Sequence, residues 1–197
     1  MNAAIAPRQS PQAAWTLADI EAMLSTIPDP EIPVVSIREL GILRDIHLHN
    51  GSVDVVITPT YSGCPAIDQI EADIRGALAI HQLDCRITRQ LSPAWTTDWM
   101  SSEAREKLRA YGIAPPHSVP QNGSKTSSQV IQFTPKKVAG YACQTGVSGT
   151  FDSENAVACP QCGSVNTTET SHFASTACKA LYKCLDCLEP FDYFKPY

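Results

Sequence analysis

Two pairs of cysteines near the end of the chain restrict its fold more than any other feature. Cys159 and Cys162 are separated by two residues, and Cys184 and Cys187 repeat that spacing. Each pair can form a tight turn whose two thiolates point at one ion, and two such turns complete a tetrahedral four-sulfur site. Zinc suits this site first and a rubredoxin-like iron second. Four unligated thiols, or a redox pair, are the alternatives.

The segment around these cysteines predicts a small, metal-dependent domain. Residues 157–197 are too few to bury a hydrophobic core of their own, so a bound metal would contribute most of the folding free energy. Gly163 supplies a permissive backbone after the first pair, whereas Leu188 follows the second. Cys178 is an additional thiol, either free and partly buried, or reactive and able to substitute as a ligand. His172 is either a solvated loop histidine or a further candidate ligand.

Composition limits the size and the compartment of the protein. The 197 residues, 43% hydrophobic and 18% charged, allow one ordinary domain or one plus a small satellite. The net charge is −5 without a basic stripe, so nucleic acid is not an expected partner. No run looks like a signal peptide or reaches the ~20 apolar residues of a membrane helix. We expect a cytoplasmic protein without membrane contact, in which eight cysteines favour metal or thiol chemistry over disulfides.

The first 116 residues predict an α+β domain with the order helix–strand–strand–helix–strand–helix. Thr16 can cap a first helix that Pro28 ends. Alternating strands lie on either side of Asn50-Gly51, the strongest short hairpin signal. Pro65 fits the first position of a second helix. The remaining elements expected are a strand from Leu83 to Leu91 and a helix from Ser101 to Tyr111, which Gly112 and Pro115-Pro116 end.

Changes in composition divide the chain into four segments. Residues 1–15 are expected to be a disordered N-terminus, and residues 16–116 form the α+β domain. Residues 117–156 are polar and predict a linker or insertion with one short strand around residues 130–133. Residues 157–197 form the metal ribbon.

Cys64 is the second candidate for chemistry. It directly precedes Pro65, and a helix N-terminus stabilises a thiolate, which predicts a lowered pKa for this cysteine. Thr60 places a hydroxyl nearby, and Asp29 and Glu31 could approach if their proline-rich loop packs over the same end of the sheet. The alternatives are a buried, small apolar Cys64 and solvated loop carboxylates. Cys85 is expected to pack in the core, and Cys143 receives no role.

Four short motifs in the first domain resemble those of the iron–sulfur cluster assembly domain family, once catalogued as a domain of unknown function. These are Asp29-Pro30-Glu31-Ile32-Pro33, Leu40-Gly41-Ile42, Thr58-Pro59-Thr60 and Gly63-Cys64-Pro65. The stretch 95–99, residues 111–116 and the motifs around Cys162, Cys178 and the C-terminus resemble one group of that family, the D subunits of bacterial phenylacetyl-CoA epoxidase systems. The resemblance covers roughly residues 16–116 and 157–197. It departs in the longer segment 117–156, and in Leu188, where many ribbons carry glycine.

The resemblance implies a small α/β iron–sulfur-assembly-type domain followed by a C-terminal four-cysteine zinc ribbon, and a non-enzymatic maturation role. Cys64 would bind or transfer a transient iron–sulfur cluster, with Asp29, Glu31 and Thr60 as its neighbours. The cofactor would be zinc. The expected partners are the phenylacetyl-CoA epoxidase subunits, especially the iron–sulfur flavoprotein reductase, in phenylacetate degradation. A homodimer is left open, and a structural adaptor or a rubredoxin-like electron carrier are the alternative functions.

Overall fold

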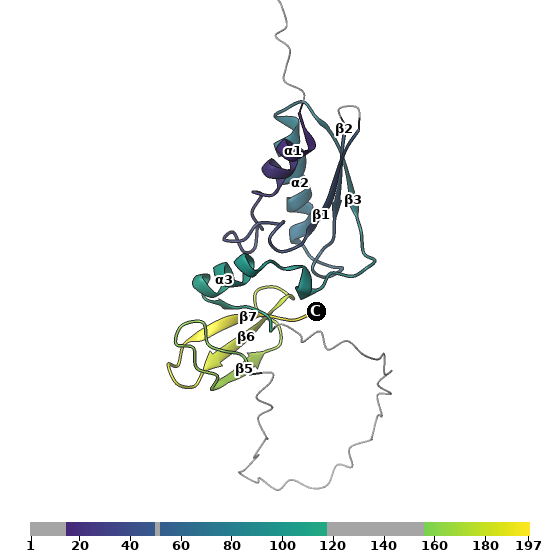
Figure 1. Cartoon of the computed structure of the whole chain (residues 1–197). Helices are drawn as coiled ribbons and strands as arrows, with labels where there is room; N and C mark the ends of the chain where they lie inside the picture. Colours follow the sequence, from purple (N-terminus) through teal and green to yellow (C-terminus); the bar gives the residue numbers. More distant parts are fainter. Residues whose placement is uncertain (1–14, 50–51, 118–155) are drawn as a thin grey trace, which may run out of the picture.

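The computed structural model describes residues 15–49, 52–117 and 156–197. The first part is an α/β unit in which two helices cover one face of a three-stranded sheet (Figure 1). The second part is a four-stranded ribbon sheet near the C-terminus. The elements follow the order α1 (Leu17–Leu24), β1 (Leu43–His49), β2 (Ser52–Ile57), α2 (Ala66–Ala79), β3 (Asp84–Arg89), a 3-10 turn (Thr97–Trp99), α3 (Ser102–Tyr111), β4 (Ile113–Ala114), β5 (Thr167–Ser171), β6 (Lys179–Cys184) and β7 (Pro190–Phe194).

Local sequence signals explain the elements of the α/β unit. Thr16 accepts a hydrogen bond from the N–H of Asp19, whose carboxylate accepts one in return from the N–H of Thr16, so a capping box starts α1. β1 and β2 pair antiparallel, and β3 joins β2 in parallel after the α2 crossover. Gly112, at φ 94°, ends α3. The predicted order of elements is confirmed, although β3 is shorter than predicted because Leu91 lies beyond its end and is exposed.

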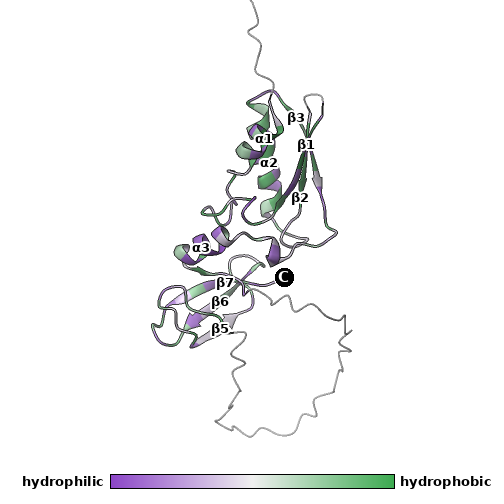
Figure 2. Cartoon of the chain, viewed as in Figure 1, coloured by the Kyte–Doolittle hydropathy of each residue, from purple (hydrophilic) through white to green (hydrophobic). Residues whose placement is uncertain are grey.

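The core of the α/β unit lies between the two helices and the sheet. Apolar residues recur at helical spacing on α2, where Ile70, Ile74 and Leu78 are fully buried. Val53, Val55 and Ile57 alternate along β2 and face them from the sheet. In Figure 2 the helices α1 and α2 and the strands of the three-stranded sheet carry green, apolar residues, while β5 at the outer edge of the ribbon is pale to purple.

The proline-rich loop between α1 and β1 is ordered by its own hydrogen bonds. The N–H of Asp29 donates to the carbonyl of Val35 at 2.9 Å, and Pro28 forms an isolated bridge with Ser36. Gly41 adopts φ 73° where a Cβ would lie 2.7 Å from Trp99, so only glycine fits this close approach. The loop therefore holds Asp29 and Glu31 in fixed positions.

A short strand that follows the last helix of the α/β unit joins the sheet of the ribbon. β4 directly follows α3 and pairs in parallel with β7, at one edge of the sheet order β4-β7-β6-β5. Phe194 at the end of β7 lies in the core of the α/β unit, with its ring centroid 5.9 Å from that of Trp95. The predicted boundary after residue 116 thus falls just beyond a strand that the two parts share.

Some sequence predictions lie outside the described residues. Asn50-Gly51, the N-terminal residues up to 14, and residues 118–155 with Cys143 and the strand around 130–133 are among them. Among the helices that are described, none has the length and apolar character needed to cross a membrane.

Candidate metal centre and thiol site

The structure brings the sulfurs of the two cysteine pairs together. The ligand atoms of Cys159, Cys162, Cys184 and Cys187 all lie within 4.8 Å of one another. The Sγ atoms of Cys159 and Cys187 are 3.7 Å apart, and those of Cys162 and Cys184 are 3.6 Å apart. Four thiolates placed tetrahedrally at the ~2.3 Å zinc–sulfur distance would have edges of about 3.8 Å. The donor set and its spacing therefore fit a tetrahedral zinc ion.

Matching turns prepare the two halves of this tetrad. Gly163 and Leu188 follow the second cysteine of each pair and adopt left-handed φ values of 76° and 68°. Leu188 thus takes the conformation that glycine takes in the first turn. The N–H of Cys187 donates to the sulfur of Cys184, and this hydrogen bond lowers the pKa of Cys184 to about 7. Oriented backbone N–H groups of this kind favour the thiolate that a metal requires.

Neither additional candidate ligand belongs to the tetrad. Among the described residues, the tetrad is the one group of three or more metal-ligating side chains with ligand atoms this close. His172 is exposed and lies 3.2 Å from Glu169. Cys178 is 4% exposed and packs in the core cluster of the α/β unit.

Cys64 lies at the loop that leads into α2. The N–H of Ala66 and the hydroxyl of Thr60 lie near its sulfur and act to lower the pKa of the thiol. Burial nevertheless raises the pKa of the thiol, and the charges of Glu31 and Asp29 raise it further. The predicted lowering of the Cys64 pKa is therefore wrong. The helix N-terminus acts in the predicted direction but is outweighed by burial and by the two carboxylates of a separate loop.

Asp29 and Glu31, on the ordered loop between α1 and β1, lie near Cys64. The Oδ1 atom of Asp29 accepts the N–H groups of Glu31 at 2.9 Å and Ile32 at 2.8 Å. Burial raises the pKa of Asp29, which is 6% exposed. Burial and the neighbouring Asp29 charge raise the pKa of Glu31. The structure thus gathers Cys64, Asp29, Glu31 and Thr60 in one place.

The ribbon contributes to the same place. The hydroxyl of Thr176 lies 3.0 Å from the sulfur of Cys178, and its proximity to Glu31 acts to lower the pKa of that carboxyl. Burial raises the pKa of Tyr61 to about 12, while the nearby N–H of Ala177 acts to lower it. Burial raises the pKa of Cys178 to about 11, and the charges of Glu31 and Cys64 add to the shift. We call this group of side chains at the contact of the α/β unit and the ribbon the junction site: Asp29, Glu31, Thr60, Tyr61, Cys64, Thr176 and Cys178.

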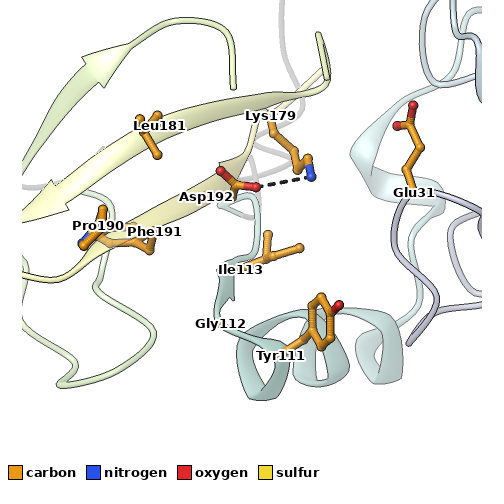
Figure 3. A pocket seen from close by; sticks show the side chains of 9 residues that line it. All are labelled: Glu31, Tyr111, Gly112, Ile113, Lys179, Leu181, Pro190, Phe191 and Asp192. Carbon is orange, nitrogen blue, oxygen red and sulfur yellow. Dashed lines mark ion pairs between the residues drawn. The ribbon is translucent and has the colours of Figure 1, made fainter. Parts of the chain in front are cut away.

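A pocket of about 440 Å³ opens beside the junction site (Figure 3). Lys179 of β6 forms a 3.2 Å ion pair with Asp192 of β7. The same ammonium group interacts electrostatically with Asp29 and Glu31, and Figure 3 shows it between Asp192 and the loop that carries Glu31. One buried cation therefore lies among three carboxylates.

Sequence reasoning assigned no role to Tyr61, Thr176 or Lys179. Tyr61 could have been found by adjacency, because it lies between Thr60 and Cys64. Thr176 could have been found because a threonine two residues before a cysteine can hydrogen bond locally. Lys179 gave no signal, since its partners lie on the neighbouring strand β7 and on the loop of the α/β unit, and both depend on the folded structure.

Comparisons with known proteins define the class of protein. Residues 17–86 match the family of iron–sulfur cluster assembly proteins, and residues 144–195 match the PaaD zinc beta ribbon domain. The chain is therefore an iron–sulfur-assembly-type domain joined to a zinc ribbon. It is 44% identical over 178 residues to the putative D subunit of the 1,2-phenylacetyl-CoA epoxidase of Escherichia coli, with 90% of this chain and 91% of that protein covered. The chain belongs to the PaaD family.

Two further proteins match about half of the chain. The Fe-S protein maturation auxiliary factor of Porphyromonas gingivalis is 36% identical over 98 residues, which cover 47% of this chain and 90% of that protein. The crystal structure of a DUF59 domain from Bacillus anthracis is 27% identical with a TM-score of 0.43, and the match covers 46% of this chain and 89% of that domain.

Proposed function

We propose that this protein is an accessory factor of a phenylacetyl-CoA epoxidase complex that assists iron–sulfur cluster assembly in, or cluster insertion into, the reductase subunit. The family membership supports the association with the epoxidase, and the maturation factor among the relatives supports the cluster chemistry. The observation that carries the proposal is the position of Cys64 among Asp29, Glu31 and Thr60.

The electrostatics of the site suit temporary binding. A thiol whose pKa is raised stays protonated near neutral pH and loses its proton only when a soft metal takes its place. The two carboxylates that disfavour an isolated thiolate also attract a cation. When the metal leaves, the thiolate regains a proton readily, so Cys64 can release iron as well as bind it. A storage site would instead hold its metal with a complete set of ligands, as the four cysteines of the tetrad can.

Zinc in the tetrad has a different task in this proposal. Four cysteines complete its coordination, so no position is left open for a substrate. Zinc supplies folding free energy and fixes the two turns, and the ribbon in turn positions β7 against the α/β unit. A purified protein should therefore contain close to one zinc per chain and lack the visible absorbance that rubredoxin-like iron would give.

Co-expression with the reductase tests the function. Reductase produced with this protein should contain more iron and acid-labile sulfide than reductase produced alone. The Cys64→Ser variant should lower both to the level found without the protein. Cys85→Ser is the matched control, since Cys85 is also half-buried, with a pKa raised by burial, but lies on β3 outside the junction site.

The same experiment separates the alternatives. If the Cys64→Ser variant has a normal melting temperature and zinc content and still yields fully loaded reductase, thiol transfer is contradicted and the adaptor function remains. If it unfolds, Cys64 is a packing residue. Iron in place of zinc in the tetrad would favour the electron carrier.

A further inference from the structure

Cys178 has no part in the zinc tetrad, although it lies in the ribbon. It immediately precedes β6, and its carbonyl accepts the N–H of Lys195 at 2.9 Å. Its side chain is buried in the same core cluster against which Cys64 packs. The ribbon thus directs this thiol toward the α/β unit and away from its own metal centre.

The two thiols share the same neighbours. The charge of Glu31 raises the pKa of both thiols, and the charges of both thiols in turn contribute to the raised pKa of Tyr61. Each sulfur also lies next to a threonine hydroxyl, Thr60 for Cys64 and Thr176 for Cys178. Two cysteines from distant parts of the chain therefore meet in one polar, partly enclosed environment.

We propose that Cys64 and Cys178 form a single two-thiol site, flanked by Glu31, that binds an iron–sulfur cluster across the contact between the α/β unit and the ribbon. This inference rests on the proposed function and adds the second ligand and the role of the ribbon to it. Outside the tetrad, no three metal-ligating atoms of the described residues converge within 4.8 Å, so a closed site for one ion is not formed here. A cluster is larger than an ion and can be held by thiols on separate elements.

The number of ligands suits a cluster in transit. A 2Fe–2S cluster takes four cysteine thiolates, and the two here supply half of that set. The open half is available to cysteines of the client, so the cluster can acquire its final ligands before it loses the first ones. Each thiol gives up one proton on binding, and no change in oxidation state is needed. Glu31 lines the adjacent pocket and lies near both sulfurs, which places an opening to solvent beside the site (Figure 3).

Anaerobic reconstitution with ferric iron and sulfide, which together supply a 2Fe–2S cluster without a further oxidant, tests the two-thiol site. The protein tested is the zinc-loaded full chain, to which iron and sulfide are added. Visible absorbance and acid-labile sulfide per chain are measured. Wild type should bind a cluster, while Cys64→Ser and Cys178→Ser should each bind it about ten-fold more weakly or worse, since loss of even an outer-shell partner costs 10–100-fold in metal affinity. The double variant should lose less than the sum of the two single losses, because both thiols serve one ligand. Cys85→Ser should bind like wild type.

Folding is controlled separately, because Cys178 is buried. Zinc content and melting temperature are measured for Cys178→Ser and for Cys178→Ala, which keeps the position apolar. A fully folded Cys178 variant that binds the cluster like wild type would overturn the two-thiol site. So would additive losses, which would indicate independent thiols. If wild type binds no cluster while reductase loading still depends on Cys64, only this inference fails. If loading does not depend on Cys64, the proposed function itself fails.

Discussion

Ionising the carboxyl group of Asp29 costs free energy, because the group is buried. Burial raises its pKa, so in the folded protein its ionised form is disfavoured relative to the unfolded chain. Protonated Asp29 therefore stabilises the folded protein relative to ionised Asp29. This stabilisation is fully present below the unfolded pKa of ~3.9 and is lost as the pH rises through the raised folded pKa. A residue that evolves under stability alone would not carry this charge here. Its electrostatic effect on Cys64 gives the charge a use.

We predict that Asp29→Asn raises the melting temperature near neutral pH. Asparagine keeps the Oδ1 acceptor for the N–H groups of Glu31 and Ile32 and removes the buried charge. The gain over wild type should be fully present above the raised folded pKa of Asp29 and should shrink as the pH falls through it toward the unfolded pKa of ~3.9. Thermal melts of both proteins across that range provide the measurement.

Asp19→Asn is the control of opposite sign. The hydrogen bonds with Thr16 lower the pKa of Asp19, so its contribution is present above the unfolded pKa and is lost as the pH falls through the folded one. This variant should therefore melt below wild type near neutral pH. A loss for Asp29→Asn at every pH would mean that the attraction between Asp29 and Lys179 outweighs the cost of burial.

The two turns of the tetrad differ in one residue, and the difference can be measured. Leu188 adopts φ 68° and is 64% exposed, so it gains little from packing. A non-glycine residue in the left-handed region costs about 1–2 kcal/mol, and glycine loses about 0.5–1 kcal/mol in backbone entropy. Leu188→Gly should stabilise the zinc-loaded protein by roughly 0.5–1 kcal/mol in denaturant unfolding.

Gly163→Ala is the matched control in the first turn. An added Cβ at Gly163 meets nothing within 4 Å, so the change tests the left-handed backbone without a steric clash. It should destabilise by roughly 1 kcal/mol. If neither variant changes the stability, the free energy of metal binding rather than the backbone preference determines the turn geometry.

The elements predicted well are those whose signal is local. The capping box of Thr16 and Asp19 and the alternation in the two antiparallel strands specify their elements within a few residues. β4 could not be predicted, because a two-residue strand has no periodicity. Its register, Ile113 opposite Asp192, depends on how the ribbon docks. The tetrad could be predicted for the same reason as the first helix and the two antiparallel strands, since the spacing of its cysteines is a local signal.

The junction site, like β4, depends on contacts between distant parts of the chain and could not be predicted in full. The position of Cys64 before a helix was correctly expected, but its pKa depends on Glu31 and Asp29, which a different loop brings to it. The proximity of Cys178 to Cys64 follows from docking two folded parts, and neither sequence neighbourhood contains that information.

In the whole molecule, metal and docking are coupled through β7. β7 pairs with β6, which carries Cys184 of the tetrad, while Phe194 of β7 lies in the core of the α/β unit. The core cluster of the ribbon itself is small, and Cys159 and Cys184 belong to it. Structural zinc contributes on the order of 10–16 kcal/mol in small zinc modules, as much as the whole stability of a typical domain. The α/β unit has its own large core and does not share this dependence.

We predict that a strong chelator unfolds the ribbon and leaves the α/β unit folded. Trp95 reports on the contact, because it is 3% exposed and its ring lies 5.9 Å from Phe194 and 6.2 Å from Tyr197. The chain has three tryptophans, so replacement of Trp15 and Trp99 by phenylalanine makes Trp95 the sole tryptophan, which can be excited apart from the tyrosines. Chelation should shift its emission to longer wavelength while the helical circular dichroism signal persists, and added zinc should reverse the shift. Complete loss of the helical signal would show that the metal holds the whole chain together. An unchanged Trp95 emission would show that β7 stays docked without zinc, and the ribbon would then not require its metal to present Cys178 to Cys64.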